Sequence, residues 1–149
     1  MKLEELVQKL DDAYPWPVDK VNAILGANLV ETDSNGVATP YVTEERLVYD
    51  EGLIVEEVEL RVFEKTGEPT RLILDFGDDA SCFTLDRVKQ TYPVLVITDM
   101  PRGRSLEEET NFSTQQSWGR ISFGFKERRP DCLSSITFIP KQWDDRERR

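Results

Sequence analysis

Two stretches of the chain, 60–76 and 121–138, share one pattern that limits the possible folds more than any other feature of the sequence. Each has two runs in which apolar and polar residues alternate, and a short polar turn separates the runs. Alternation with a period of two is typical of a β-strand with one buried face and one exposed face. Each stretch is therefore predicted to form a β-hairpin.

The two predicted hairpins follow similar segments, which indicates an internal duplication. Residues 18–21 and 85–88 both read apolar, Asp, basic, Val, and a turn containing glycine follows each, at Gly36 and Gly103. The order helix, strand, glycine turn, long irregular segment and hairpin thus occurs twice. We predict an α+β fold of two related helix-plus-antiparallel-sheet units in tandem, which share one compact body. The predicted parts are a first unit at 1–79, a second unit at 80–142 and a charged C-terminal tail at 143–149.

Apolar residues at helical spacing predict three helices. The first begins near Leu3 and ends before Pro15, the second spans 18–25, and the third follows Thr84, which is a suitable N-cap. Trp16 lies between two prolines and is expected to pack at the corner between the first two helices.

Acidic residues are concentrated in the first half of the chain. The net charge is −10, and residues 1–79 hold 19 acidic and 7 basic side chains, whereas residues 80–149 hold 10 acidic and 12 basic ones. So acidic a surface repels phosphate groups, which makes nucleic acid and anionic membranes poor partners. A basic protein would instead be attracted to it.

The sequence shows no signal for a membrane or for export. No apolar run approaches the roughly 18 residues that a membrane span needs, and the first residues are amphipathic and acidic, unlike a secretory signal. We therefore expect a cytoplasmic protein. Cys82 and Cys132 match neither a disulfide framework nor a four-ligand metal site, and they are expected to be buried thiols.

Few residues of the chain suit catalysis. It has no histidine, so the commonest general base and zinc ligand are missing, and it has neither a Walker loop nor a GxGxxG motif. Asp75, Asp78 and Asp79 leave one alternative open, because carboxylate oxygens are suitable ligands for a divalent ion in a carboxylate- or metal-dependent enzyme. The favoured prediction is a protein with no catalytic residues, no cofactor and no metal.

A small, acidic, histidine-free α+β domain of this kind resembles the immunity proteins that neutralise secreted interbacterial toxins of the type VI and contact-dependent systems. The paired hairpins and the two apolar-Asp-basic-Val helices, which cover most of 17–139, also look like the architecture of the β-lactamase inhibitor protein. That architecture has two tandem units whose sheets form a concave inhibitory surface. The resemblance implies that an acidic surface docks on a basic toxin catalytic domain and blocks its active site.

The predicted function is therefore that of a stoichiometric binding protein, and the alternatives are the enzyme described above and a secretion-system adaptor or chaperone. Glu57 and Glu59 should share one face of a strand, with Glu56 on the other. The predicted contact surface contains seven carboxylates and two aromatic anchors: Asp50, Glu51, Glu56, Glu57, Glu59, Asp78, Asp79, Trp16 and Tyr49.

Overall fold

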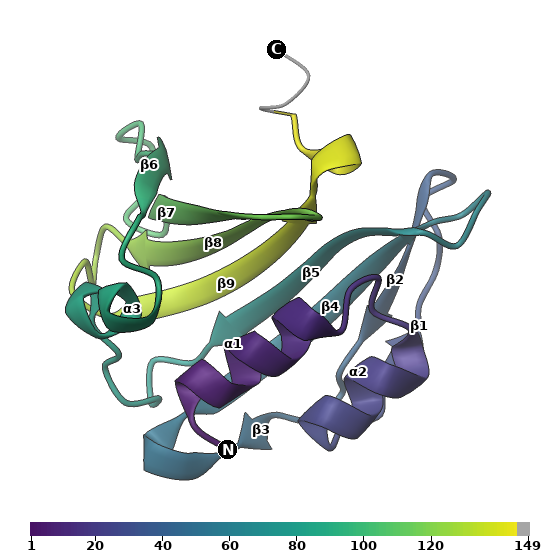
Figure 1. Ribbon diagram of the computed structural model, residues 1–149, viewed down its shortest axis with the longest axis horizontal. Coiled ribbons are helices and arrows are strands. Elements are labelled where there is room, and N and C mark those ends of the chain that lie inside the picture. Colours follow the sequence, from purple (N-terminus) through teal and green to yellow (C-terminus); the bar gives the residue numbers. More distant parts are fainter. Residues whose placement is uncertain (146–149) are drawn as a thin grey trace.

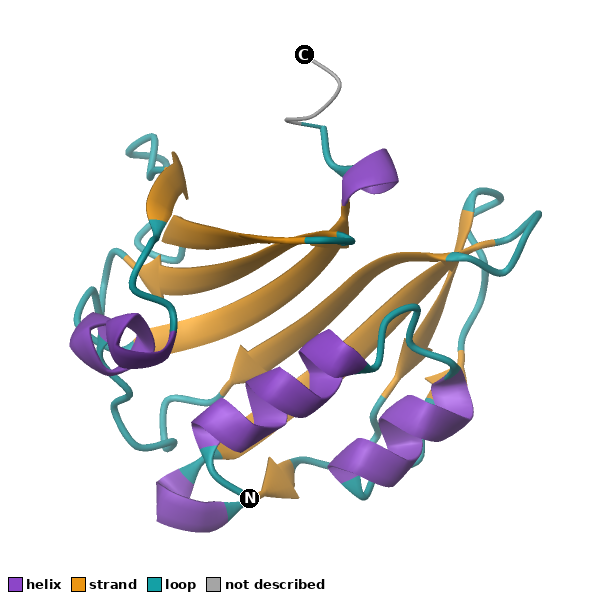
Figure 2. Ribbon diagram, in the orientation of Figure 1, coloured by secondary structure: helices purple, strands orange, loops and turns teal. Residues whose placement is uncertain are grey.

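The computed structural model describes residues 1–145 and shows the predicted α+β fold. Three α-helices and nine strands lie within these residues, and all the strand pairs are antiparallel (Figure 1). The helices cover one face of a single sheet, and Figure 2 shows them in front of the strands. The other face of the sheet is open.

The strands form one sheet in the order β1-β2-β4-β5-β9-β8-β7-β6, with β3 paired to β4. The strands and their bounds are β1 (Val30–Glu31), β2 (Ala38–Val42), β3 (Leu47–Val48), β4 (Ile54–Phe63), β5 (Pro69–Phe76), β6 (Val96–Asp99), β7 (Glu109–Gln116), β8 (Gly119–Lys126) and β9 (Leu133–Pro140). The hairpins β4–β5 and β8–β9 are the two that the sequence predicts, so both predictions are confirmed.

The three helices form where the sequence predicts them: α1 (Leu3–Asp12), α2 (Val18–Leu25) and α3 (Leu85–Thr91). Gly26 ends α2 in the left-handed conformation, at φ 65°, which glycine adopts without a steric penalty. Thr84 caps α3, because its side chain accepts a hydrogen bond from the backbone N–H of Arg87. Short 3-10 helices η1 (Asp50–Gly52) and η2 (Lys141–Trp143) complete the elements.

One hydrophobic core fills the space between the helices and the sheet. The apolar side of α1 packs there with the inward alternation of both hairpins, which includes the fully buried Leu60, Leu72, Ile121 and Phe138. Trp16 lies at the corner as predicted, with 2% of its surface exposed, and its indole N–H donates to the Leu10 carbonyl at 2.7 Å. None of the helices in the described part of the chain is long and apolar enough to cross a membrane.

The two halves of the chain meet at the centre of the sheet. Strand β5 pairs with β9 through four residue pairs, from Leu72 with Phe138 to Asp75 with Ser135. Outward from this seam, β4, β2 and β1 lie on one side and β8, β7 and β6 on the other. Each half thus places its hairpin at the centre and its first strand at an edge. The internal duplication stays a prediction, and this strand order agrees with it.

The prediction about the two cysteines is wrong. Cys82 and Cys132 are expected as buried thiols, but they form a disulfide, and Cys82 is exposed. Sequence spacing could not show the pair, because the sheet brings the end of β5 beside the start of β9. The C-terminal tail at 143–149 stays a prediction, and within it Asp144 is buried with 2% of its surface exposed. Residues 146–149 of that tail lie outside the described residues.

Candidate functional site: the open face of the sheet

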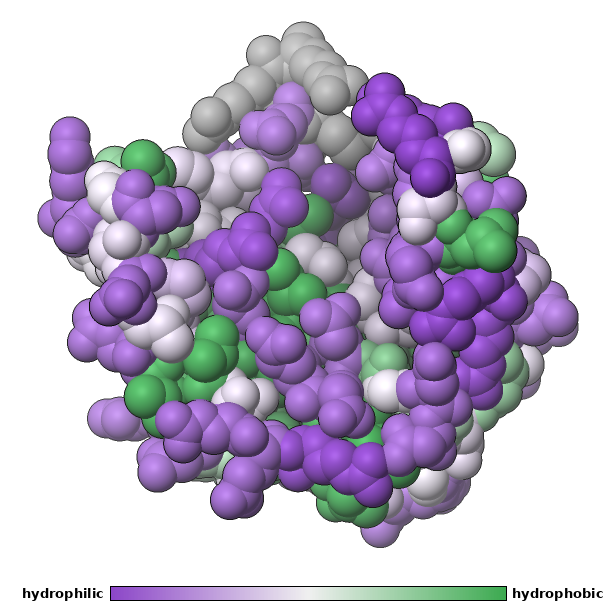
Figure 3. Space-filling model, turned by 180° about the vertical axis from the view of Figure 1, so that it is seen from behind, coloured by the Kyte–Doolittle hydropathy of each residue, from purple (hydrophilic) through white to green (hydrophobic). Residues whose placement is uncertain are grey.

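The face of the sheet that no helix covers carries polar and charged side chains at its centre. Alternation along each strand directs Glu57, Asp75, Ser135 and Asn111 to this side, because the apolar neighbours of these residues face the helices. Seen from behind, the molecule is hollowed toward the middle of this face, and hydrophilic atoms prevail around the hollow (Figure 3). The central strands of both halves thus contribute to one concave surface.

Four carboxylates gather on one side of the hollow, and we call them the acidic patch: Glu57, Glu59, Asp75 and Glu109. Glu57 lies directly opposite Asp75 on the neighbouring strand. The pKa of Asp75 is raised by burial and then by the negative charges of Glu109, Glu57 and Glu59, while Lys126 opposes the shift. Like charges directly opposite each other in a sheet are destabilising, so the acidic patch costs folding free energy.

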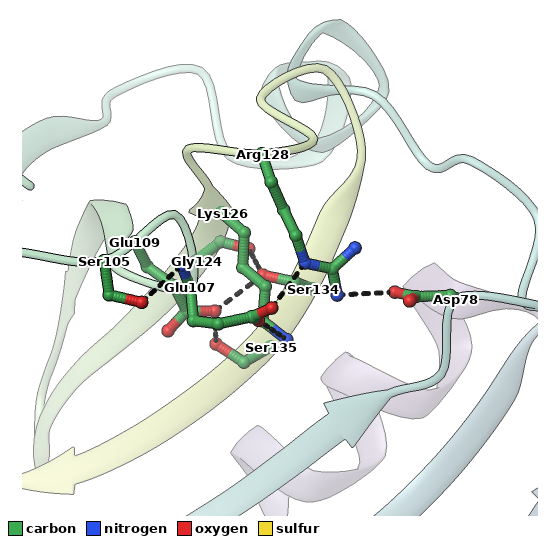
Figure 4. A network of polar contacts seen from close by, with 9 residues as sticks. All are labelled: Asp78, Ser105, Glu107, Glu109, Gly124, Lys126, Arg128, Ser134 and Ser135. Carbon is green, nitrogen blue, oxygen red and sulfur yellow. Dashed lines mark hydrogen bonds and ion pairs between the residues drawn. The ribbon is translucent and has the colours of Figure 1, made fainter.

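Hydrogen bonds fix Glu109 within the acidic patch (Figure 4). Its Oε2 accepts from the hydroxyl of Ser134 at 2.6 Å and from that of Ser135 at 2.7 Å, both on β9. Glu109 comes from β7 and reaches β9 across Gly124 of β8. A Cβ at Gly124 would lie 2.6 Å from that carboxylate oxygen, so only glycine leaves room for the crossing.

Ion pairs hold the loops beside the acidic patch in place. Glu107 accepts from Lys126 at 2.9 Å and from Arg128 at 2.7 Å. Arg128 also donates to Asp78 at 2.8 Å, which links the β8–β9 turn to the loop after β5 (Figure 4). These contacts lower the pKa of Glu107 and of Asp78, through hydrogen bonds from the basic side chains first.

The other side of the hollow is rich in arginine. Arg61 of β4 faces Arg71 of β5, and a pocket of about 350 Å³ opens beside Arg71. Arg120 lines the same pocket and is buried, with its Nε 2.6 Å from Asp144 Oδ2 and one Nη 2.9 Å from Ser113 Oγ. Asp99, Glu109, Asp144 and Asp145 also line this pocket, so this side of the hollow holds arginines together with carboxylates.

The structure separates the carboxylates that the sequence groups into one contact surface. Asp50 pairs with the N-terminal amino group, and Glu51 pairs with Arg87 at 2.7 Å. Both contacts lower the pKa of the carboxyl group concerned. These two residues lie in η1, beside the start of α1 and away from the hollow (Figure 1).

The remaining carboxylates of the predicted contact surface also lie in different places. Glu57 and Glu59 share the open face as predicted, and Glu59 pairs with Arg61 at 2.8 Å. Glu56 falls in an irregularity of the ladder between Val55 and Glu57, and Asp79 pairs with Arg46.

Neither aromatic anchor is free to meet a partner. Trp16 is buried, as described above, so the structure contradicts its assignment to the contact surface. Tyr49 is half-buried, and its hydroxyl donates to the Leu25 carbonyl at 2.6 Å. Burial raises the pKa of Tyr49 to about 12. Both rings therefore contribute to packing within the chain.

The carboxylates of the alternative metal site do not converge. Asp75 faces the hollow, whereas Asp78 forms an ion pair with Arg128 and Asp79 forms one with Arg46. Within residues 1–145, no group of three or more Cys, Asp or Glu side chains is placed to hold a metal ion.

Sequence reasoning missed two members of the acidic patch. Alternation along β5 places Asp75 on the same side as Glu57, but the sequence analysis considered Asp75 only as a possible metal ligand. Glu109 gave no comparable signal, because its position depends on the register of three strands and on Gly124.

No protein-family model, curated protein or solved structure matches this chain.

Proposed function

We propose that the protein is a stoichiometric immunity protein that binds a basic toxin domain through the open face of its sheet. The main support for this proposal is that two residues of like charge, Glu57 and Asp75, lie directly opposite each other on neighbouring strands, beside Glu109. The chain places these like charges side by side on a concave surface at a cost in stability. Lysine or arginine side chains of a partner would relieve the repulsion, so complex formation would recover that free energy.

The arrangement favours this mode of binding over the wider acidic surface that the sequence predicts. Asp50, Glu51, Asp78 and Asp79 already have basic partners within the chain, so they offer less to an incoming cation. Among residues 1–145, Glu57 forms no ion pair, so its charge remains available to a cation of the partner. The adaptor function would use the same face without blocking an active site.

The test is co-expression with the toxin domain encoded by the neighbouring gene, followed by binding kinetics on the purified pair. The double variant Glu57→Gln/Asp75→Asn should lower the association rate about tenfold at low salt, because steering by charge is lost. The matched control is Glu44→Gln/Glu45→Gln, which removes two exposed carboxylates elsewhere. If wild-type protein neither forms a complex nor rescues growth, the immunity proposal is wrong. If both double variants slow association equally, the contact surface lies elsewhere.

We propose that the protein acts in the cytoplasm. The disulfide between Cys82 and Cys132 makes the compartment the first part of this proposal to test. Disulfides persist mainly in oxidising compartments, whereas cytoplasmic thiols are kept reduced. Rapid alkylation of intact cells, followed by electrophoresis, reports whether Cys82 and Cys132 are oxidised there. Complete alkylation supports the cytoplasm, and a fully protected pair would place the protein in an oxidising compartment.

A further inference from the structure

The pocket beside Arg71 on the open face is lined by small polar side chains of the two central strands of the second half. Ser122 of β8 lies directly opposite Thr137 of β9 in the ladder. Both side chains are on the open side of the sheet, because the neighbouring Ile121 and Phe138 are buried in the core. Both residues line the pocket, whose volume is about 350 Å³. Hydroxyl groups from two adjacent strands therefore face the same space.

These hydroxyl groups have no partner in the part of the chain that the structure describes. Ser122 has only 3% of its surface exposed, yet its side chain forms no hydrogen bond to any of residues 1–145. The hydroxyl of Thr137 and the side-chain amide of Asn111 line the same pocket and also form none there. Buried polar groups normally have a hydrogen-bond partner. The Ser122 hydroxyl can gain one from a molecule that enters the pocket.

Arg71 adds a positive charge that no acidic group in residues 1–145 neutralises. It lies directly opposite Arg61 on β4, and like charges in that position repel each other. Glu59 pairs with Arg61 at 2.8 Å, whereas the guanidinium of Arg71 forms neither an ion pair nor a hydrogen bond with the described residues. Its N–H groups are therefore available to an anion.

The carboxylates that line the pocket limit the charge of such an anion. Asp144 pairs with the buried arginine described above, and Glu109 accepts hydrogen bonds from two serines of β9. Asp99 and Asp145 are exposed. All four lie near enough to line the pocket without pairing with Arg71, so they add negative potential to it. An anion with one charge is repelled less than one with two.

We propose that this pocket binds a carboxylate group, with Arg71 as its ion-pair partner and the hydroxyl groups of Ser122 and Thr137 as hydrogen-bond donors. A guanidinium donates to both oxygens of a carboxylate at once, and a hydroxyl rotates to donate to either. The carboxylate belongs to a free small organic acid or to an aspartate or glutamate side chain of a bound protein. The site does not depend on the immunity function.

Titration of the disulfide-bonded protein with acetate, at neutral pH and constant ionic strength, tests the site. Two-dimensional ¹H–¹⁵N spectra follow the backbone amides of Ser122 and Thr137 and the Nε–H of Arg71, all of which should shift and saturate. Arg71→Gln should raise the dissociation constant at least about tenfold, because a charge-assisted contact is lost. Inorganic phosphate should bind more weakly than acetate, and tighter binding of phosphate would contradict a site for a carboxylate.

Ser122→Ala separates a role in binding from a role in the fold. It should raise the dissociation constant about fivefold, which corresponds to the loss of one neutral hydrogen bond. It should not lower the free energy of unfolding, because the hydroxyl has no partner among residues 1–145. A loss of stability with unchanged acetate binding would overturn the assignment of this hydroxyl to the site.

A blocked peptide, acetyl-Gly-Asp-Gly amide, distinguishes the two sources of the carboxylate. Tighter binding of this peptide than of acetate identifies an acidic side chain of a protein partner, and weaker binding identifies a free acid. The analogue with asparagine in place of aspartate is the control and should not bind. Equal binding of the two peptides would overturn the proposal, since it would show that the pocket does not recognise the charge.

The matched control variant is Arg61→Gln, which removes the neighbouring arginine on the same face, outside the residues that line the pocket. It should leave the dissociation constant for acetate within about threefold of wild type, because Glu59 already pairs with Arg61. Equal weakening by Arg71→Gln and Arg61→Gln would show attraction by the face in general and overturn the site. The absence of saturable shifts with both acetate and the aspartate peptide would also overturn it.

Discussion

Asp75 shows at the scale of one residue how the open face differs from an ordinary exposed surface. Its pKa is raised, first by burial and then by the charges of Glu109, Glu57 and Glu59, so the folded state binds the proton more tightly than the unfolded chain. Glu4 shows the opposite behaviour. Its pKa is lowered, chiefly by a hydrogen bond from Arg87, so its charged form is stabilised by folding.

These opposite shifts predict opposite effects on stability. At neutral pH, Asp75→Asn should raise the free energy of unfolding by about 0.2–1 kcal/mol, because it removes a like-charge pair. The gain should disappear as pH falls, since protonation of Asp75 relieves the same repulsion in wild type and restores stability below its folded pKa. Urea denaturation at neutral pH and at mildly acidic pH measures the difference.

The control for this prediction is Glu4→Gln, which should lower stability at neutral pH. Its effect should fade as pH falls, because wild type itself loses this contribution once Glu4 is protonated. A loss of stability in Asp75→Asn at neutral pH would contradict the assignment of Asp75 as a repulsive group.

Only part of this residue-level arrangement could be predicted from the sequence. Alternation along one strand places Glu57 and Glu59 on the same face, because side-chain direction in a strand is a local property. The approach of Glu109 to Ser135 depends on the register of β7, β8 and β9, which local spacing does not encode. Cys82 and Cys132 pair for the same reason, through contacts between segments 50 residues apart.

At the scale of elements, a buried ion pair joins Arg120 of β8 to Asp144, which directly follows η2. This contact holds the segment after β9 against β8. Arg120 has 9% and Asp144 has 2% of its surface exposed, and two guanidinium N–H groups donate to the carboxylate at 2.6 and 3.2 Å. A charge left buried without its partner is far more costly than the pair is stabilising.

Asp144→Asn should therefore lower the free energy of unfolding by about 3–5 kcal/mol. The neighbouring exposed Asp145 provides the control, and Asp145→Asn should be close to neutral. Thermal and urea denaturation of both variants measure the effect. Equal stability of the two variants would show that the ion pair of Asp144 with Arg120 does not stabilise this segment.

The elements themselves were largely predictable, whereas their assembly was not. The helices and hairpins follow from spacing, prolines and turn residues within short windows, and they form where expected. The contact of β5 with β9 joins residues 60 to 66 positions apart in the sequence, and alternation shows only that each strand has a buried face. Chain 143–149 was expected as a tail because its composition is charged, but the buried partner of Asp144 lies on β8.

At the scale of the whole molecule, the sheet and the disulfide hold the two halves together. Cys82 follows β5 and Cys132 precedes β9, so the covalent bond lies at one end of the strand pair that joins the halves. A crosslink restricts the unfolded chain more strongly when it closes a longer loop, and this one spans 50 residues.

Cys82→Ser/Cys132→Ser should lower the free energy of unfolding by about 2–4 kcal/mol. Urea denaturation measures the loss, and wild-type protein in excess dithiothreitol serves as the control because it should unfold at the same midpoint as the variant. Identical midpoints for the oxidised and reduced wild type would contradict a stabilising disulfide.

The position of the same disulfide also determines what proteolysis can release. A single cut between Cys82 and Cys132, for example in the exposed loop that carries Arg102 and Arg104, divides the polypeptide but leaves both fragments covalently attached. The fragments migrate as one species until a reductant is added. The nicked molecule can thus keep its β5–β9 seam, and with it the hollow on the open face.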